Sequence, residues 1–84
     1  MVKKLISDED RLKLCDELNA MTTDYSNSVI GYRIYCKKCD VDKYLALGKK
    51  YNLNCHTEQK DDFYIVTLDF YDYDTDNNET IKRG

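Results

Sequence analysis

Residues 62–79, DFYIVTLDFYDYDTDNNE, begin with the strongest strand pattern in the chain and end in carboxylates with tyrosines between them. Side chains of an extended strand point alternately to its two faces. Alternation places Tyr64, Val66, Leu68 and Phe70 on one face and Phe63, Ile65, Thr67 and Asp69 on the other. We therefore predict one long strand over residues 63–72, apolar on both faces as far as Leu68.

Four further elements follow from helical and strand periodicity. Ser7 precedes an acidic first turn, and apolar residues then recur at helical spacing up to Met21, which predicts a helix over residues 8–21. Residues 22–28, TTDYSNS, favour a loop because such side chains bond to their own backbone. The remaining patterns predict a strand over residues 29–36, a helix over 41–51 after a capping Asp40, and a strand over 53–58.

This order, α-β-α-β-β, predicts a two-layer α+β fold with two helices on one face of a small three-stranded mixed sheet. Strands 53–58 and 63–72 should form an antiparallel hairpin. Strand 29–36 reaches strand 53–58 through a helix, and the two would run parallel if they were neighbours.

Length and composition indicate one folded domain. The chain has 84 residues, of which 42% are hydrophobic and 35% charged, with no proline and three glycines. We predict a single domain over residues 1–84 with a frayed acidic tail from about residue 74 to residue 84. The first residues lack the apolar stretch of a signal peptide, and no run approaches the ~20 apolar residues that span a bilayer. A cytoplasmic protein with reduced cysteines is therefore expected.

The net charge of −3 is unevenly distributed. Residues 1–33 carry a net charge of −1, residues 34–60 carry +3, and residues 61–84 carry −5. A dominant basic face, which phosphate contacts require, is missing from this pattern, so it argues against general nucleic-acid binding. The acidic end instead suits a basic partner protein.

A C-x-x-C motif, Cys36-Lys37-Lys38-Cys39, lies between a predicted strand and a predicted helix. That order resembles the thioredoxin-like enzymes over these few residues, and the resemblance implies thiol redox chemistry at Cys36 and Cys39. The chain departs from that family because it has no proline to face the cysteines and no tryptophan before the motif.

Zinc binding is a second hypothesis, because Cys36, Cys39, Cys55 and His56 supply the four ligands that a structural site requires. On a strand over residues 53–58, however, Cys55 and His56 point to opposite faces. The competing interpretation is that the cysteines pack as small hydrophobic residues. We predict no metal and no cofactor.

Calcium binding and catalysis have weaker patterns. Asp72, Asp74 and Asp76 match the opening of an EF-hand loop, but Asn77 replaces its turn glycine and Arg83 its closing glutamate. His56 is the only histidine, and on a polar strand face it is expected to be a solvated surface residue. We therefore predict that the protein is not an enzyme.

These observations predict a non-enzymatic protein-binding module, of the kind that phage or virus inhibitors represent, whose acidic tyrosine-rich surface occupies a basic site on a partner. Its predicted contact residues are Asp69, Tyr71, Asp72, Tyr73, Asp74 and Asp76. The bland interpretation is that the acids only solubilise the tail and guard a strand against aggregation.

Two further possibilities stay open. A weak RNA-associated module would use Lys37, Lys38, Lys43, Lys49 and Lys50. A homodimer could form if the long third strand lay at a sheet edge.

Overall fold

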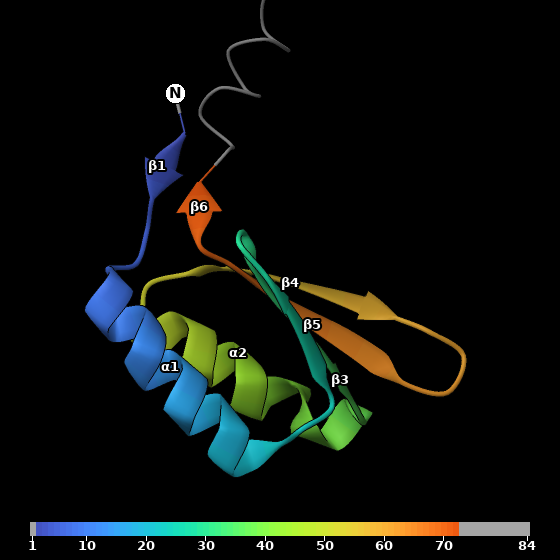
Figure 1. The fold of residues 1–84 in the computed structure, drawn as a ribbon. Coiled ribbons are helices and arrows are strands. Elements are labelled where there is room, and N and C mark those ends of the chain that lie inside the picture. The colour runs from blue at the N-terminus through green and yellow to red at the C-terminus, as the bar shows by residue number, and fades with distance from the viewer. Residues whose placement is uncertain (1, 73–84) are drawn as a thin grey trace, which may run out of the picture.

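The computed structural model describes residues 2–72, which form two helices packed on one face of a sheet (Figure 1). The elements in chain order are β1 (Lys3–Lys4), α1 (Asp8–Met21), β2 (Tyr25–Ser28), β3 (Gly31–Cys36), the 3-10 helix η1 (Lys38–Asp40), α2 (Val41–Lys50), β4 (Asn54–Gln59), β5 (Tyr64–Asp69) and β6 (Tyr71–Asp72). The α+β class is confirmed. The tail predicted from about residue 74 lies outside the described residues.

The main sheet has four strands in the order β2-β3-β5-β4, and each neighbouring pair is antiparallel. The prediction of three strands in a mixed sheet is therefore wrong. β3 and β4 do run parallel, but β5 lies between them. β5 carries apolar side chains on both of its faces. In the central position, β3 lies along one of its edges and β4 along the other.

The segment predicted to be a loop contains β2. Its four residues pair with β3 from Tyr25 opposite Ile34 to Ser28 opposite Gly31. The Tyr25 ring also meets the Tyr32 ring edge to face, with 5.4 Å between centroids. Pairing with β3 and this ring contact outweigh the local turn preference of Ser and Asn. Ile30, which lies within the strand predicted over residues 29–36, is instead exposed in the β2–β3 turn.

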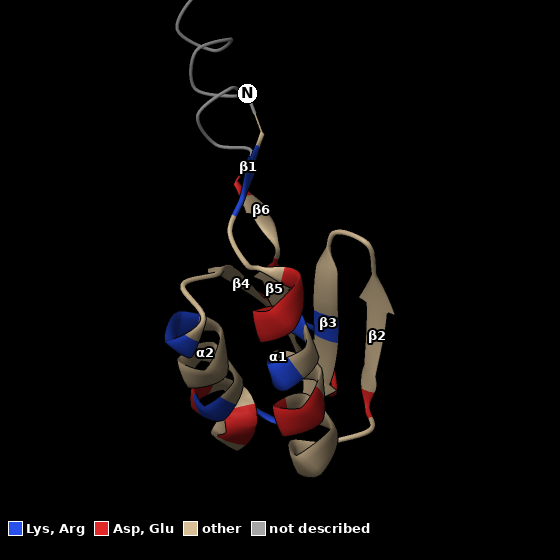
Figure 2. Ribbon diagram, turned by 60° about the vertical axis from the view of Figure 1, so that its left-hand side comes forward, with Lys and Arg blue, Asp and Glu red and all other residues tan. Residues whose placement is uncertain are grey.

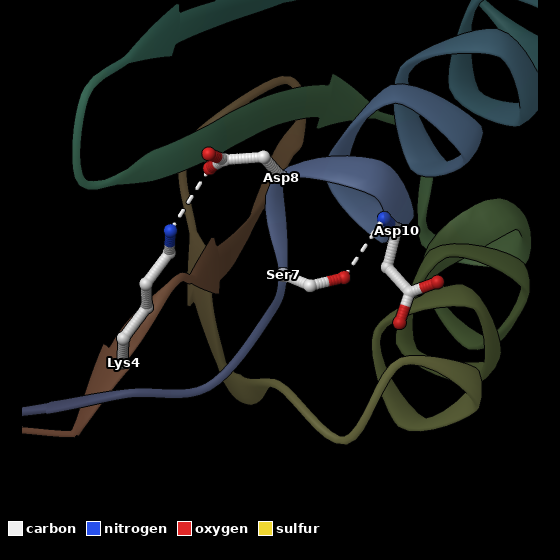
Figure 3. Close-up of polar contacts among 4 residues, drawn as sticks. All are labelled: Lys4, Ser7, Asp8 and Asp10. Atoms are coloured by element: carbon white, nitrogen blue, oxygen red, sulfur yellow. Dashed lines mark hydrogen bonds and ion pairs between the residues drawn. The ribbon is translucent and has the colours of Figure 1, made fainter.

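Helix α1 has the bounds that the sequence predicts. The Ser7 hydroxyl accepts a hydrogen bond from the Asp10 main-chain N–H at 3.1 Å, which satisfies one of the unpaired donors of the first turn (Figure 3). Leu14 and Leu18 are fully buried against the sheet. Leu12, expected in the same apolar stripe, is 70% exposed.

Helix α2 packs closely on the sheet through Gly48. A Cβ at this position would lie 2.4 Å from Cys55 Sγ and 2.7 Å from Leu68 Cδ2, so the absent side chain permits the close approach. The preceding Asp40, predicted to cap α2, makes no side-chain cap hydrogen bond. Its carboxylate instead lies 3.6 Å from Lys43 Nζ.

The long strand predicted over residues 63–72 changes partners at Phe70. The Phe70 N–H donates to the Ile30 carbonyl, and the Phe70 carbonyl accepts from the Leu5 N–H, each at 2.8 Å. Before this residue the chain pairs as β5 with β3 and β4; after it, the chain pairs as β6 with β1. The Phe70 side chain is 1% exposed and meets Tyr32 edge to face, so core packing fixes the bend.

None of the helices in residues 2–72 has the length and apolar character needed to cross a bilayer.

Candidate functional site

The six predicted contact residues fall into three groups. Asp69 ends β5 in the main sheet, whereas Tyr71 and Asp72 form β6 in the two-stranded sheet. Tyr73, Asp74 and Asp76 lie outside the described residues. The structure therefore places the first three on two different sheets, because the chain bends at Phe70.

Asp69 lies on the face of the main sheet opposite the helices, which we call the outer face. His56 Nε2 is 2.9 Å from Asp69 Oδ2. The His56 side chain is 62% exposed and the Asp69 side chain 22% exposed. The sole histidine is therefore at the surface, as predicted, but it contacts a carboxylate that the sequence had assigned to partner binding.

Tyr71 and Asp72 belong to an arm formed by β1 and β6. In this arm Lys3 is opposite Asp72 and Lys4 is opposite Tyr71, and Figure 2 shows the basic β1 beside β6. Tyr71 is partly buried against the core, and both Tyr71 and Asp72 interact with other residues of the protein. The ring predicted to meet a partner is thus used in part to hold the arm against the domain.

The base of the arm is tied to α1. Lys4 Nζ lies 2.9 Å from Asp8 Oδ1, which joins β1 to the first turn of the helix (Figure 3). The hydrogen bond raises the pKa of Lys4 and lowers the pKa of Asp8. Both groups are exposed, so this pair orients the arm more than it stabilises the fold.

The four candidate zinc ligands are not brought together. Cys36 ends β3, Cys39 lies in η1, and Cys55 lies on β4, which β5 separates from β3. Cys55 packs against the core on the helix side, whereas His56 is on the outer face, as strand alternation predicts. Within residues 2–72, no three His, Cys, Asp or Glu side chains are grouped to hold a metal ion.

The surroundings of Cys36, the first cysteine of the C-x-x-C motif, do not favour its thiolate form. Burial raises the pKa of Cys36, and the nearby Asp40 and Cys39 raise it further. Burial likewise raises the pKa of Cys55. Because the thiolate is the nucleophile, a raised pKa leaves these two sulfurs less reactive at neutral pH.

The outer face carries an apolar region that the sequence reading did not assign to a site. Tyr35 and Phe63 meet edge to face with 6.1 Å between ring centroids, beside a shallow pocket of about 430 Å³ lined by Asp24, Cys36 and Lys37. Ile65, on the same face, is 3% exposed. The sequence pattern could have predicted this apolar region, since Phe63 and Ile65 alternate with the core-facing residues of β5.

The lysines of the predicted RNA-associated surface are partly engaged. Lys50 of α2 forms an ion pair with Glu17 of α1, and Lys43 lies 3.6 Å from Asp40. Figure 2 shows residues of both signs on each helix, and counted from the sequence α1 carries a net charge of −3 and α2 one of +2.

A comparison with family models, with curated proteins and with solved structures finds no match to this chain. Function is therefore inferred from the residues of the chain itself.

Proposed function

We propose that this chain is a non-enzymatic protein-binding module that binds a basic site on a partner protein through its acidic, tyrosine-bearing C-terminal segment. Residues 69–79 carry five acidic side chains and no basic one. Opposite charge at such a surface would accelerate encounter with a basic partner and select against acidic ones. Occupation of that site would exclude another anionic ligand of the partner, which is the inhibitory form of the same function.

The pairing of β6 with β1 is the observation that supports this proposal. Main-chain bonding at Phe70 and the register of Lys3 with Asp72 fix the path of the chain as far as residue 72. The acidic residues that follow are therefore attached directly to an ordered strand. Such an anchor lowers the conformational entropy that a binding segment loses when it meets its partner.

The charges of the arm refine which residues should matter most. Asp69 lies on the main sheet and contacts His56, whereas Asp72 lies on the arm and is followed along the chain by Asp74 and Asp76. We therefore assign most of the steering to Asp72, Asp74 and Asp76 acting together, with Tyr71 and Tyr73 supplying contact area. Asp69 has a smaller assigned role.

The rival functions have less support. A thiol or zinc module at Cys36 and Cys39 would need a reactive thiolate or two further ligands, and burial raises the pKa of Cys36. An RNA-associated module would need the lysines that contact Glu17 and Asp40. The thiol rival therefore lacks an activated thiolate at Cys36, and in the RNA rival two of the five lysines already contact carboxylates.

Affinity capture from the native host, followed by mass spectrometry, tests the proposal. The triple variant Asp72→Asn, Asp74→Asn and Asp76→Asn should lose the captured protein and flatten the salt dependence of its binding. A matched control changes Asp42, Asp61 and Asp62 to asparagine, which alters the net charge equally. Equal loss in both variants, or no loss in either, would refute the assignment of the acidic segment.

A further inference from the structure

β4 is an open edge of the main sheet. It lies last in the order β2-β3-β5-β4 and pairs without interruption with β5, from Asn54 opposite Asp69 to Gln59 opposite Tyr64. The strand contains no proline, and its constant register leaves no bulge. In an antiparallel edge strand, half of the main-chain N–H and C=O groups point away from the sheet. Natural edges are usually blunted, because such groups can pair with another strand.

Most of this edge is also accessible. The last four residues of β4 are exposed, and they include Thr57, which faces the helix side of the sheet opposite Val66. The β4–β5 hairpin extends beyond the helices in Figure 1. A second strand could therefore lie along β4 without meeting α2 at this end.

The sequence of β4 is complementary to itself when read antiparallel. About a centre at Thr57, His56 of one copy lies opposite Glu58 of the other, and this pair occurs twice. Directly opposite side chains on the same face interact, and the imidazole of one copy can donate a hydrogen bond to the carboxylate of the other. Thr57 then lies opposite its own counterpart, which is another favourable cross-strand pair.

We propose that a second copy of this chain pairs antiparallel with β4 about a two-fold axis through Thr57. The axis stands perpendicular to the sheet, so the helices of both copies lie on the same side. The four-stranded sheets join into one sheet with eight strands in the order β2-β3-β5-β4-β4-β5-β3-β2. Apart from Asp69, which contacts His56, this surface is separate from the acidic C-terminal segment, and the inference does not depend on the proposed function.

The side chains of β4 favour this register over the two adjacent ones, which are centred on Glu58 and on His56. Centred on Glu58, the pairing would place this carboxylate opposite itself and His56 opposite Lys60. Centred on His56, it would place the imidazoles opposite each other and lose the pair to Glu58. Like charges directly opposite destabilise a strand pair, which disfavours the Glu58 centre. The His56 centre is disfavoured because it lacks the imidazole–carboxylate pair. Within one copy His56 already contacts Asp69, and Glu58 contacts Lys60 at 2.6 Å, which leaves the two groups ordered on the outer face.

The other edge of the sheet is a poorer candidate. β2 has four residues against the six of β4, and its sequence, Tyr-Ser-Asn-Ser, offers no charged pair in any self-pairing register. A dimer through β2 would therefore lack both the length and the electrostatic selection that β4 has.

Sedimentation velocity on the full chain provides the first test. The chain should show a reversible monomer–dimer equilibrium, and both Glu58→Lys and His56→Glu should raise the dimer Kd at least about 10-fold. The double variant His56→Glu, Glu58→Lys places opposite charges across the interface and should recover most of that loss. Asp61→Lys, in the adjacent turn, changes the charge equally and should leave the Kd within about 3-fold of the parent.

Cross-linking tests the register even if charge reversal weakens the fold. Under mild oxidation Thr57→Cys should form a bond between the two copies of residue 57, because directly opposite residues lie within disulfide reach. Peptide mapping identifies the linked residues among the native thiols. The proposal is overturned by a chain that stays monomeric at about 1 mM, by a double variant no tighter than the single ones, or by linkage through Ser26→Cys on β2 instead.

Discussion

The carbonyl oxygen of Leu68 occupies the place where a side chain on Gly31 would begin: a Cβ at position 31 would lie 2.1 Å from it. Gly31 starts β3 and is paired with Asp69 of β5, so the main chains of the two central strands lie side by side at this position. The obstacle is a main-chain atom of the central strand, which cannot rotate away.

Gly31→Ala should therefore destabilise the protein by about 1–3 kcal/mol, since β3 must shift relative to β5. Urea unfolding measures this change. Gly48→Ala is the comparison, because its obstacles are the side-chain atoms Cys55 Sγ and Leu68 Cδ2, which can move. A Gly31 variant that is less destabilised than the Gly48 variant would contradict the explanation.

Ser7→Ala should cost about 1 kcal/mol of stability, because it removes the hydroxyl that accepts from the Asp10 N–H at the start of α1. Chemical denaturation of the variant and of Ser7→Asp, which retains an acceptor, separates capping from a change of side-chain size. Equal losses in both variants would mean that the cap contributes nothing measurable.

Glu17 should make the stability of the protein depend on pH in the acidic range. The hydrogen bond from Lys50 holds the pKa of Glu17 below its ordinary value of 4.5. A carboxylate with a lowered folded pKa contributes stability above its ordinary value, and this contribution is lost as the pH falls through the folded pKa. Glu17→Gln should therefore lose stability at neutral pH but match the parent in strong acid, as measured by thermal unfolding at both pH values. Glu9→Gln, whose pair to Lys13 spans 4.0 Å, is the charge-matched control and should change little.

Tyr32 should make the stability of the protein depend on pH in the alkaline range. Burial, together with the hydrogen bond to Cys15, raises the pKa of Tyr32 from 10.0 to about 12. A raised folded pKa means that its contribution is complete below pH 10 and is lost as the pH rises towards 12. The ultraviolet absorbance of tyrosinate should include a late contribution from the Tyr32 ring, and Tyr32→Phe should reduce the late absorbance by one ring, leaving that of Tyr51, whose pKa is also raised. Late absorbance that is undiminished in this variant would assign it to other tyrosines.

The cysteines should differ in reactivity at neutral pH. Cys39 is exposed, whereas burial raises the pKa of both Cys36 and Cys55. A thiol reagent followed by mass spectrometry should therefore modify Cys39 at least about 10-fold faster than Cys36. Rapid labelling of Cys36 in a Cys39→Ser variant would instead favour the thiol-redox alternative.

The sequence predicted individual elements well wherever one local signal was sufficient. The bounds of α1 follow from Ser7, the acidic first turn and the spacing of Leu14 and Leu18. The buried face of β5 follows from simple alternation through Val66 and Leu68. In each case residues that are near in sequence determine which face is apolar.

Predictions were incomplete wherever an element depends on pairing with residues distant in the sequence. β2 consists of residues with turn preference that become a strand only beside β3. The strand predicted over residues 63–72 bends at Phe70 because Ile30 and Leu5, both far away in sequence, bond to it. The same bend places Asp69 on the main sheet and Tyr71 on the arm, a division that alternation alone does not predict.

The sequence by itself determined the α+β class, the helix bounds at Asp8–Met21, and the opposite facing of Cys55 and His56, because backbone geometry and side-chain period act locally. Only the tertiary structure decided that β5 lies between β3 and β4, that β6 pairs with β1, and that β4 rather than the long strand is an open edge. Strand order depends on which apolar faces and main-chain groups can be covered simultaneously by residues distant in the chain. That is a property of the whole packed sheet and not of any one segment.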